Sequence, residues 1–168
     1  WNATAQANTT QANAPLQTLH GRVEAQAART PDAVAAVYQG RQLSYAQLNQ
    51  QANALAHQLL ERGVQPDDRV VILARRGLET LVGLLATLKS GACYVPVDPA
   101  HPAERLSYLL QDSDPVVVLT QHDLLTRLPA LEVPVIQLDR PTFHLGTNPR
   151  VPVSATNLAY VIYTSGST

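Results

Sequence analysis

Apolar residues follow two alternating patterns from residue 69 to residue 138. Continuous apolar runs, typical of buried strands, cover 69–74, 93–97, 115–119 and 133–138. Apolar positions at helical spacing predict helices at 78–89, 102–110 and 122–128. Strands that alternate with helices form parallel sheets whose faces the helices cover. The pattern therefore predicts an α/β fold with a mostly parallel sheet and flanking helices.

The strongest local signal comes earlier in the chain, at Ser44. Ser44 is a favourable N-cap residue, and Gln47 three positions later completes a capping box. An apolar stripe follows at helical spacing, at Tyr45, Leu48, Ala52, Leu55, Leu59 and Leu60. Gly63 supplies a C-terminal stop, so a helix is predicted between Ser44 and this glycine.

The first 45 residues divide into an uncharged tract, a helix and a pair of strands. Residues 1–15 carry no charge and only one large apolar side chain. Such a tract buries too little surface to offset the entropy of ordering, which predicts a linker. A helical face then collects Leu16, Leu19, Val23 and Ala27 before Thr30-Pro31 ends the helix. Strands at 33–38 and 42–45 flank a turn at 39–41.

The last predicted strand, a buried one at 158–163, runs into a small loop rich in hydroxyl groups. The loop consists of Thr164, Ser165, Gly166, Ser167 and Thr168. Its N–H groups and hydroxyls can face an anion, because the glycine permits positive φ and close approach. Ligands of open α/β sheets bind outside the carboxyl ends of strands, which favours a phosphate-binding loop over a plain turn. We therefore expect a piece of a larger nucleotide-using protein, with the loop continuing beyond residue 168.

Composition and charge narrow the function classes. The net charge is −1 with the two signs interspersed, which argues against a nucleic-acid or anionic-membrane surface. No apolar run reaches the ~20 residues of a transmembrane helix. The N-terminus lacks the pattern of a signal peptide, so a cytoplasmic protein is expected. Cys93, the only cysteine, is expected to be a small buried apolar residue.

Single residues give weaker candidates. Lys89 could bind a phosphate or carboxylate, but a lysine in the last turn of a helix more often serves the helix dipole and faces solvent. Asp98 could be an acid or a metal ligand, but an aspartate before proline commonly starts a turn. The five histidines are scattered without ligand spacing. No metal site and no catalytic residue is therefore predicted within the chain.

Three segments, in this order and spacing, resemble the first three core motifs of the adenylation domains of nonribosomal peptide synthetases. They are Leu-Ser-Tyr-Ala-Gln-Leu at 43–48, Leu-Lys-Ser-Gly-Ala-Cys-Tyr-Val-Pro-Val-Asp at 88–98, and Leu-Ala-Tyr-Val-Ile-Tyr-Thr-Ser-Gly-Ser-Thr at 158–168. Residues from Leu19 to Val34, Glu24 among them, resemble the stretch that opens these domains. Trp1-Asn2 resembles the tail of a preceding condensation domain.

The resemblance implies a truncated N-terminal portion of the large subdomain of an adenylate-forming enzyme. Residues 1–15 would be an interdomain linker after a condensation domain, and 16–168 the start of the adenylation domain. The parent enzyme is expected to activate an amino acid with ATP and Mg²⁺, and to load it onto the phosphopantetheine of a downstream peptidyl carrier domain. Residues 164–168 are expected to hold the ATP phosphates. The catalytic and specificity residues would follow them, so the fragment alone is expected to be inactive.

Two alternatives stay open at this point. An acyl- or aryl-CoA ligase shares the loop at 164–168, although 94–98 and the Trp1-Asn2 start favour an assembly-line module. A non-catalytic binding or docking module is the other alternative, with residues 1–168 as the whole product.

Overall fold

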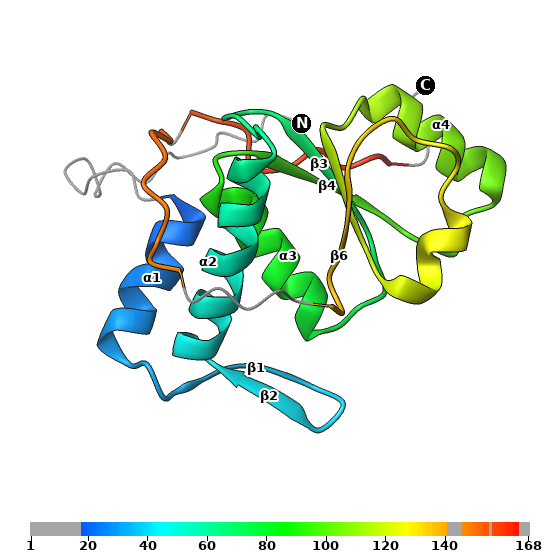
Figure 1. The fold of residues 1–168 in the computed structure, drawn as a ribbon. Helices are drawn as coiled ribbons and strands as arrows, with labels where there is room; N and C mark the ends of the chain where they lie inside the picture. The colour runs from blue at the N-terminus through cyan, green and yellow to red at the C-terminus, as the bar shows by residue number, and fades with distance from the viewer. Residues whose placement is uncertain (1–17, 141–145, 155, 165–168) are drawn as a thin grey trace, which may run out of the picture.

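A four-stranded parallel sheet forms the centre of the computed structural model, which describes residues 18–140, 146–154 and 156–164 (Figure 1). The strands are β3 (Arg69–Leu73), β4 (Cys93–Val97), β5 (Val117–Thr120) and β6 (Val135–Gln137), in the order β4-β3-β5-β6. All three strand pairs are parallel. The predicted α/β fold, with a parallel sheet and flanking helices, is confirmed.

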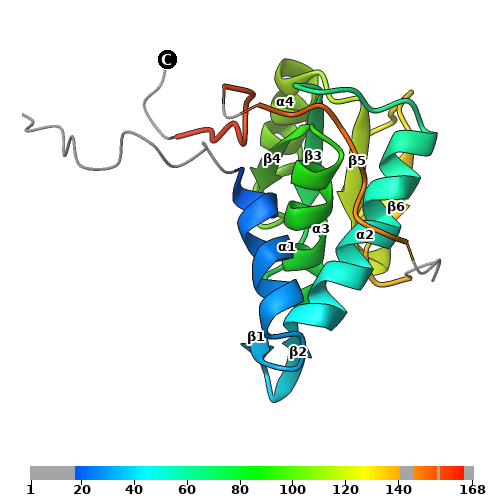
Figure 2. The same cartoon turned by 90° about the vertical axis from the view of Figure 1, so that its left-hand side faces the viewer.

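Strand β3 shows why both faces of the sheet carry helices. Val70 and Ile72 belong to one apolar cluster, whereas Val71 and Leu73 belong to a second cluster, because side chains alternate along a strand. Residues of α2 (Tyr45–Glu61) and α3 (Leu78–Lys89) complete the first cluster, and residues of α4 (Ala103–Ser113) complete the second. Figure 2 shows α1 (Leu19–Arg29), α3 and α2 side by side on the same side of the sheet.

Helix α2 begins as the sequence predicts. The Ser44 hydroxyl accepts the N–H of Gln47 at 3.2 Å, and the Gln47 side chain accepts the N–H of Ser44 at 2.9 Å. This capping box satisfies two of the backbone donors that a helix start leaves unpaired. Just before the helix, β1 (Val34–Tyr38) and β2 (Arg41–Ser44) form an antiparallel hairpin. Its turn has positive φ at Gln39 and Gly40.

Replacing Ser44 with Ala is expected to lower the free energy of unfolding by ~1 kcal/mol, because the N-cap hydrogen bond is lost. For a chain of this size that change corresponds to a fall in Tm of roughly 2–4 °C. Ser44→Asp is the matched control, since an aspartate can also cap the helix. Thermal unfolding of the two variants measures the difference. Equal stability of Ser44→Ala and the unchanged protein would show that the cap contributes nothing.

The predicted and observed elements differ mainly at their ends. Helix α3 and strand β4 have the predicted bounds. Pro102 is the N-cap of α4, where it was predicted as the first helical residue, and the helix continues to Ser113. The predicted helix at 122–128 is a 3-10 helix, η2 (His122–Arg127), in which the N–H of Leu124 bonds three residues back to the carbonyl of Gln121. The predicted linker at 1–15 lies outside the described residues.

The prediction of a buried strand at 158–163 is wrong in its burial and its regularity. This segment makes one parallel bridge, between Tyr94 and Tyr160, and it lies along the outer edge of β4. The N–H of Tyr94 donates to the carbonyl of Ala159 at 3.1 Å, and the N–H of Val161 donates to the carbonyl of Tyr94 at 3.0 Å. Leu158, Tyr160 and Ile162 are each more than half exposed. Within the described residues no further element covers the outward side of this segment.

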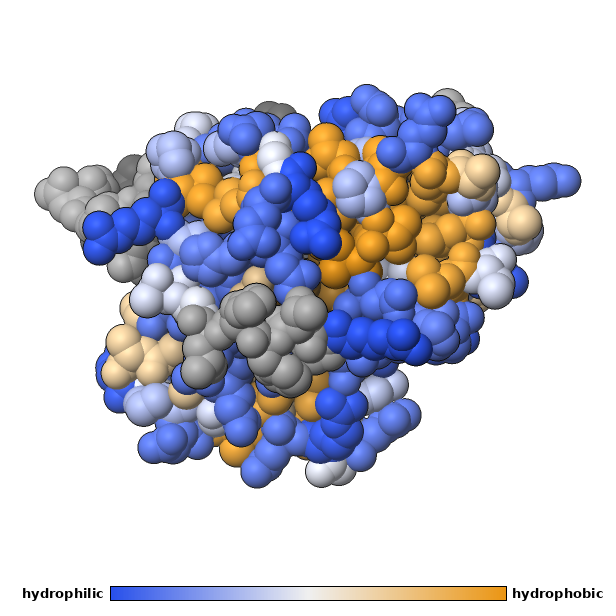
Figure 3. All heavy atoms as spheres, in the orientation of Figure 1, coloured by the Kyte–Doolittle hydropathy of each residue, from blue (hydrophilic) through white to orange (hydrophobic). Residues whose placement is uncertain are grey.

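Strand β6 forms the opposite edge of the sheet. Figure 3 shows apolar surface gathered on the right of the view, in the area that β6, α4 and η2 border. Val135 of β6 is 37% exposed. An open edge strand with apolar neighbours favours association with other chains unless another element covers it.

Among the described helices, none is long and apolar enough to cross a membrane.

Candidate functional site

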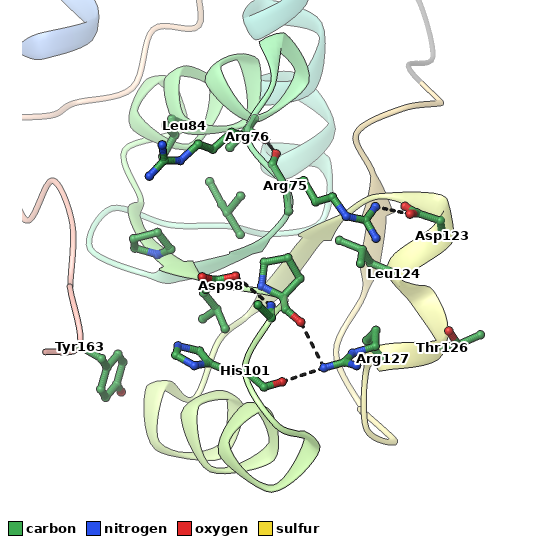
Figure 4. Close-up of a pocket in the computed structure, with 17 residues that line it drawn as sticks. Arg75, Arg76, Leu84, Asp98, His101, Asp123, Leu124, Thr126, Arg127 and Tyr163 are labelled. Carbon is green, nitrogen blue, oxygen red and sulfur yellow. Dashed lines mark hydrogen bonds and ion pairs between the residues drawn. The ribbon is translucent and has the colours of Figure 1, made fainter. Parts of the chain in front are cut away.

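A cleft of about 780 Å³ lies at the carboxyl ends of β3, β4 and β5 (Figure 4). Its apolar wall includes Ile72 at the end of β3 and Pro96 and Val97 at the end of β4. The remaining lining comes from the loops after β3 and β4, from α3, from η2 (His122–Arg127) after β5, and from Tyr163. In open parallel sheets this edge is where ligands bind, because the strand ends and the loops after them converge there.

The end of β3 is tied to the end of β5 by Arg75. The Arg75 guanidinium forms an ion pair with Asp123, and its backbone N–H donates to the Gln121 side chain at 2.9 Å. The hydroxyl of Thr80, in the first turn of α3, donates to the Arg75 carbonyl at 2.6 Å. These contacts hold the first residues after β3 in one place on the rim of the cleft.

A second arginine fixes the loop after β4. Arg127 of η2 donates to the carbonyls of Pro99 and His101, at 3.1 and 2.7 Å. In the same loop the Asp98 carboxylate accepts the N–H of Ala100 at 2.8 Å. The interpretation of Asp98 as a turn residue is therefore confirmed. Among the described residues, no group of three or more His, Cys, Asp or Glu side chains is placed to hold a metal ion.

Tyr163 connects the hydroxyl-rich loop to the cleft. Its ring lines the cleft, and its hydroxyl donates to the Asp112 carboxylate at 2.6 Å. Burial, and then the hydrogen bond to Asp112, raise the pKa of Tyr163 to about 12. The segment that ends in Tyr163 runs parallel to β4, so Tyr163 lies at the same edge of the sheet as the cleft.

The predicted phosphate loop begins at that point. Thr164 is the one loop residue that the structure describes, and it is exposed. The other four, Ser165, Gly166, Ser167 and Thr168, lie outside the described residues. Their phosphate-binding role stays a prediction.

Lys89 differs from its predicted setting. We expected a lysine facing solvent, but its side chain is fully buried and forms an ion pair with Glu24 of α1. The ammonium group also donates to the Asn148 side chain at 3.3 Å. Burial lowers the pKa of Lys89, and the hydrogen bond to Glu24 partly opposes that effect. The prediction failed because α1 and the residues around Asn148 cover the end of α3, and the local helix pattern does not reveal that cover.

Cys93 agrees with the sequence. Its side chain is fully buried, and this burial raises the pKa of the thiol. A buried thiol with a raised pKa is a poor nucleophile. Cys93 therefore serves as a small apolar residue of β4.

The arginines of the cleft are the residues that sequence reasoning missed. Arg75 and Arg76 come two and three positions after Leu73, the last residue of the first strand of the parallel sheet. The signal was present in the sequence: a pair of basic residues at the carboxyl end of a predicted buried strand stands where α/β folds bind ligands.

Comparison with known proteins agrees with this architecture. Residues 23–168 match the family of AMP-binding enzymes. The chain is 50% identical over 155 residues to a linear gramicidin synthase protein of Brevibacillus parabrevis, covering 89% of this chain and 3% of that protein. It is 44% identical over 167 residues to the dimodular nonribosomal peptide synthase of Bacillus subtilis, covering 92% of this chain and 7% of that protein. The chain thus spans a small fraction of the length of these relatives.

Solved structures give the same result. The nonribosomal peptide synthetase FmoA3, in its α-methyl-L-serine-AMP bound form, superposes with a TM-score of 0.82 at 35% identity, over 90% of this chain and 18% of that chain. The N-terminal subdomain of Klebsiella oxytoca NpsA, in complex with 3-hydroxybenzoyl-AMSN, superposes with a TM-score of 0.78 at 27% identity. That match covers 91% of this chain and 39% of the NpsA chain. The resemblance to adenylation domains found in the sequence is confirmed.

Proposed function

Because the chain belongs to the family of AMP-binding enzymes, we propose that it is the N-terminal part of an adenylation domain in a nonribosomal peptide synthetase. In this proposal the carboxylate of an amino acid attacks the α-phosphorus of ATP. The bond to the β-phosphate breaks, and an aminoacyl-adenylate and pyrophosphate form. The acyl group then passes to the phosphopantetheine thiol of a peptidyl carrier domain, and AMP leaves.

The observation that carries the proposal is the placement of 158–163 beside β4. This parallel alignment brings Tyr163 to the edge of the sheet that holds the arginine-lined cleft, and we infer that the residues after it continue there. Residues 164–168 would there hold the ATP phosphates with N–H groups and hydroxyls. Mg²⁺ would accompany ATP and take most of its ligands from phosphate oxygens and water.

The residues of this chain would act by position and charge. Backbone hydrogen bonds of the sheet hold the three strand ends that form the walls of the cleft. Groups on its rim therefore need little rearrangement when a substrate binds. The cleft residues fit a phosphate-bearing ligand, because three arginines line it against two aspartates. We also propose that 1–15 form the linker from a condensation domain and that 16–168 begin the adenylation domain.

The relatives favour this function over the alternatives. An acyl- or aryl-CoA ligase shares the Thr-Ser-Gly-Ser-Thr loop, but the similar proteins described above are peptide synthetases. The reading frame upstream discriminates, since the proposal requires a condensation domain before Trp1. The frame downstream is expected to continue the loop with Gly-x-Pro-Lys-Gly, whose lysine would add positive charge for phosphate.

We expect amino-acid-dependent ATP–pyrophosphate exchange from the polypeptide that carries this chain, and none from residues 1–168 alone. Residues 1–168 would lack the amino-acid pocket and the catalytic lysine that the resemblance assigns to later parts of an adenylation domain. Radiolabelled pyrophosphate exchange, tested with each of the common amino acids, measures both activities. Exchange by purified 1–168 would contradict the proposed division of labour, and no exchange by the complete polypeptide with any amino acid would contradict the function.

A further inference from the structure

The order of the strands singles out the part of the cleft between the ends of β3 and β5 as a ligand-binding position. The chain enters the sheet at β3, moves to β4 on one side, and then crosses to β5 on the other side of β3. The connection after β3 leads to β4, and the connection after β5 leads the opposite way, to β6, which opens a crevice between the carboxyl ends of β3 and β5. In doubly wound sheets of this order, that crevice is the place where ligands bind.

Two arginines stand beside this crevice, and they differ in their partners. The charge of Arg75 is balanced by its ion pair with Asp123. Arg76 is exposed and lines the same cleft, and within the described residues its guanidinium has no hydrogen bond or ion pair. In Figure 4 the Arg76 guanidinium and the Tyr163 ring both lie on the left of the view, whereas the pair of Arg75 and Asp123 lies on the right.

The other charged groups of the cleft do not neutralise Arg76. Asp98 is engaged by the N–H of Ala100 in its own loop, and Asp123 by Arg75. Arg127 donates to two backbone carbonyls, which are uncharged, so its positive charge is not balanced by these contacts. The cleft thus has an excess of positive charge, although the whole chain has a net charge of −1.

We propose that Arg76, at the crevice between β3 and β5, binds a phosphate group of a substrate, as a position separate from the loop at 164–168. The inference rests on the proposed function, which supplies two phosphate-bearing substrates, ATP with its pyrophosphate product and the phosphopantetheine arm. A guanidinium matches phosphate because its planar N–H groups can donate two parallel hydrogen bonds to the oxygens. Arg75, held by Asp123, keeps the adjoining backbone in place.

The test compares Arg76→Ala, Arg76→Lys and Arg22→Ala in the complete polypeptide. Arg22 is the matched control, since it is an exposed arginine on α1 and lies outside the cleft. Exchange kinetics give KM for ATP and for pyrophosphate, and loading kinetics give KM for the carrier domain. We expect Arg76→Ala to raise at least one of these KM values by about tenfold or more, the loss of one charge-assisted contact.

The KM values of the variants show whether Arg76 binds phosphate and which substrate supplies it. Arg76→Lys is expected to recover part of the loss, because it keeps the charge without the fork, whereas Arg22→Ala should leave every KM unchanged. A rise confined to ATP and pyrophosphate identifies the nucleotide as the ligand, and a rise confined to the carrier domain identifies its pantetheine phosphate. Unchanged KM values for all three substrates in Arg76→Ala would overturn the inference and leave the proposed function intact.

A direct titration separates the inference from the function. Pyrophosphate is titrated calorimetrically into the unchanged polypeptide and into the Arg76→Ala and Arg22→Ala variants. If the polypeptide catalyses no exchange, the proposed function fails. Pyrophosphate binding that is lost only in Arg76→Ala would then still support the site. Equal binding in all three proteins, or none in any, together with the absence of exchange, would overturn the inference as well.

Discussion

Replacing Gly166 with Val in the complete polypeptide is expected to lower ATP–pyrophosphate exchange by about a hundredfold or more, with the fold retained. The loop at 164–168 is predicted to bring its backbone against phosphate, and a β-branched side chain obstructs that approach. Losing one hydrogen bond to a charged phosphate costs ~1.5–3 kcal/mol, and the obstructed approach removes more than one such bond. The loss of two bonds corresponds to a factor of about a hundred or more in rate. Backbone strain of ~1–3 kcal/mol would add a loss of stability.

Gly40 provides the matched control for that substitution. It has positive φ, +76°, in the turn between β1 and β2, and a Cβ added there would meet no atom within 4 Å. Gly40→Val is therefore expected to lower stability through its backbone alone and to leave exchange kinetics unchanged once folded. If Gly166→Val instead keeps a normal exchange rate at saturating ATP and a normal apparent affinity for ATP, the loop is a structural turn.

The elements that the sequence predicted well are those that local interactions determine. The capping box at Ser44 and Gln47 forms because both partners lie within one turn of the chain. Helix α3 and strand β4 have their predicted bounds, since their apolar patterns match the buried faces of an α/β fold. The placement of Asp98 in a turn also follows from its immediate neighbour, Pro99.

The failures concern contacts between segments far apart in the sequence. The apolar residues at 158–163 predicted a buried strand, but the segment lies at the sheet edge, and each of Leu158, Tyr160 and Ile162 is more than half exposed. Lys89 was expected in solvent, but Glu24 is 65 positions away and Asn148 is 59 positions away in the chain. Helical spacing describes one helix face and does not say which other segment covers it.

In the candidate site too, the part made of consecutive residues could be predicted from the sequence, and the part made of distant segments could not. The hydroxyl-rich loop stood out in the sequence because its five residues are consecutive. The cleft did not, because it joins the ends of three strands with residues from 72 to 163. The arginines at 75 and 76 follow a predicted strand in the sequence, but only the strand order places them beside the end of β5.

Breaking the ion pair between Lys89 and Glu24 is expected to give the largest loss of stability among substitutions outside the apolar core. Removing one partner of a buried pair costs ~3–5 kcal/mol, because the remaining charge is left without compensation. Glu24→Ala leaves the ammonium group of Lys89 in place, and the Lys89 side chain is fully buried. The Glu24 side chain is 23% exposed, which favours the lower end of that range. A loss of ~3 kcal/mol lowers Tm by roughly 6–12 °C for a chain of this size.

Lys89→Met separates the cost of an unpaired charge from the cost of a lost contact. Methionine fills the space of the lysine stem and needs no partner, and Glu24 keeps partial access to water. We therefore expect Lys89→Met to cost less than ~1.5 kcal/mol, well below the cost of Glu24→Ala. Urea unfolding of both variants, with Lys89→Met combined with Glu24→Ala as the third, measures the difference. Adding Glu24→Ala to Lys89→Met should cost little, because the charge that it would strand is gone. If Glu24→Ala is no more harmful than Lys89→Met, the buried ammonium group does not depend on Glu24, and the pair contributes no more than an exposed ion pair would.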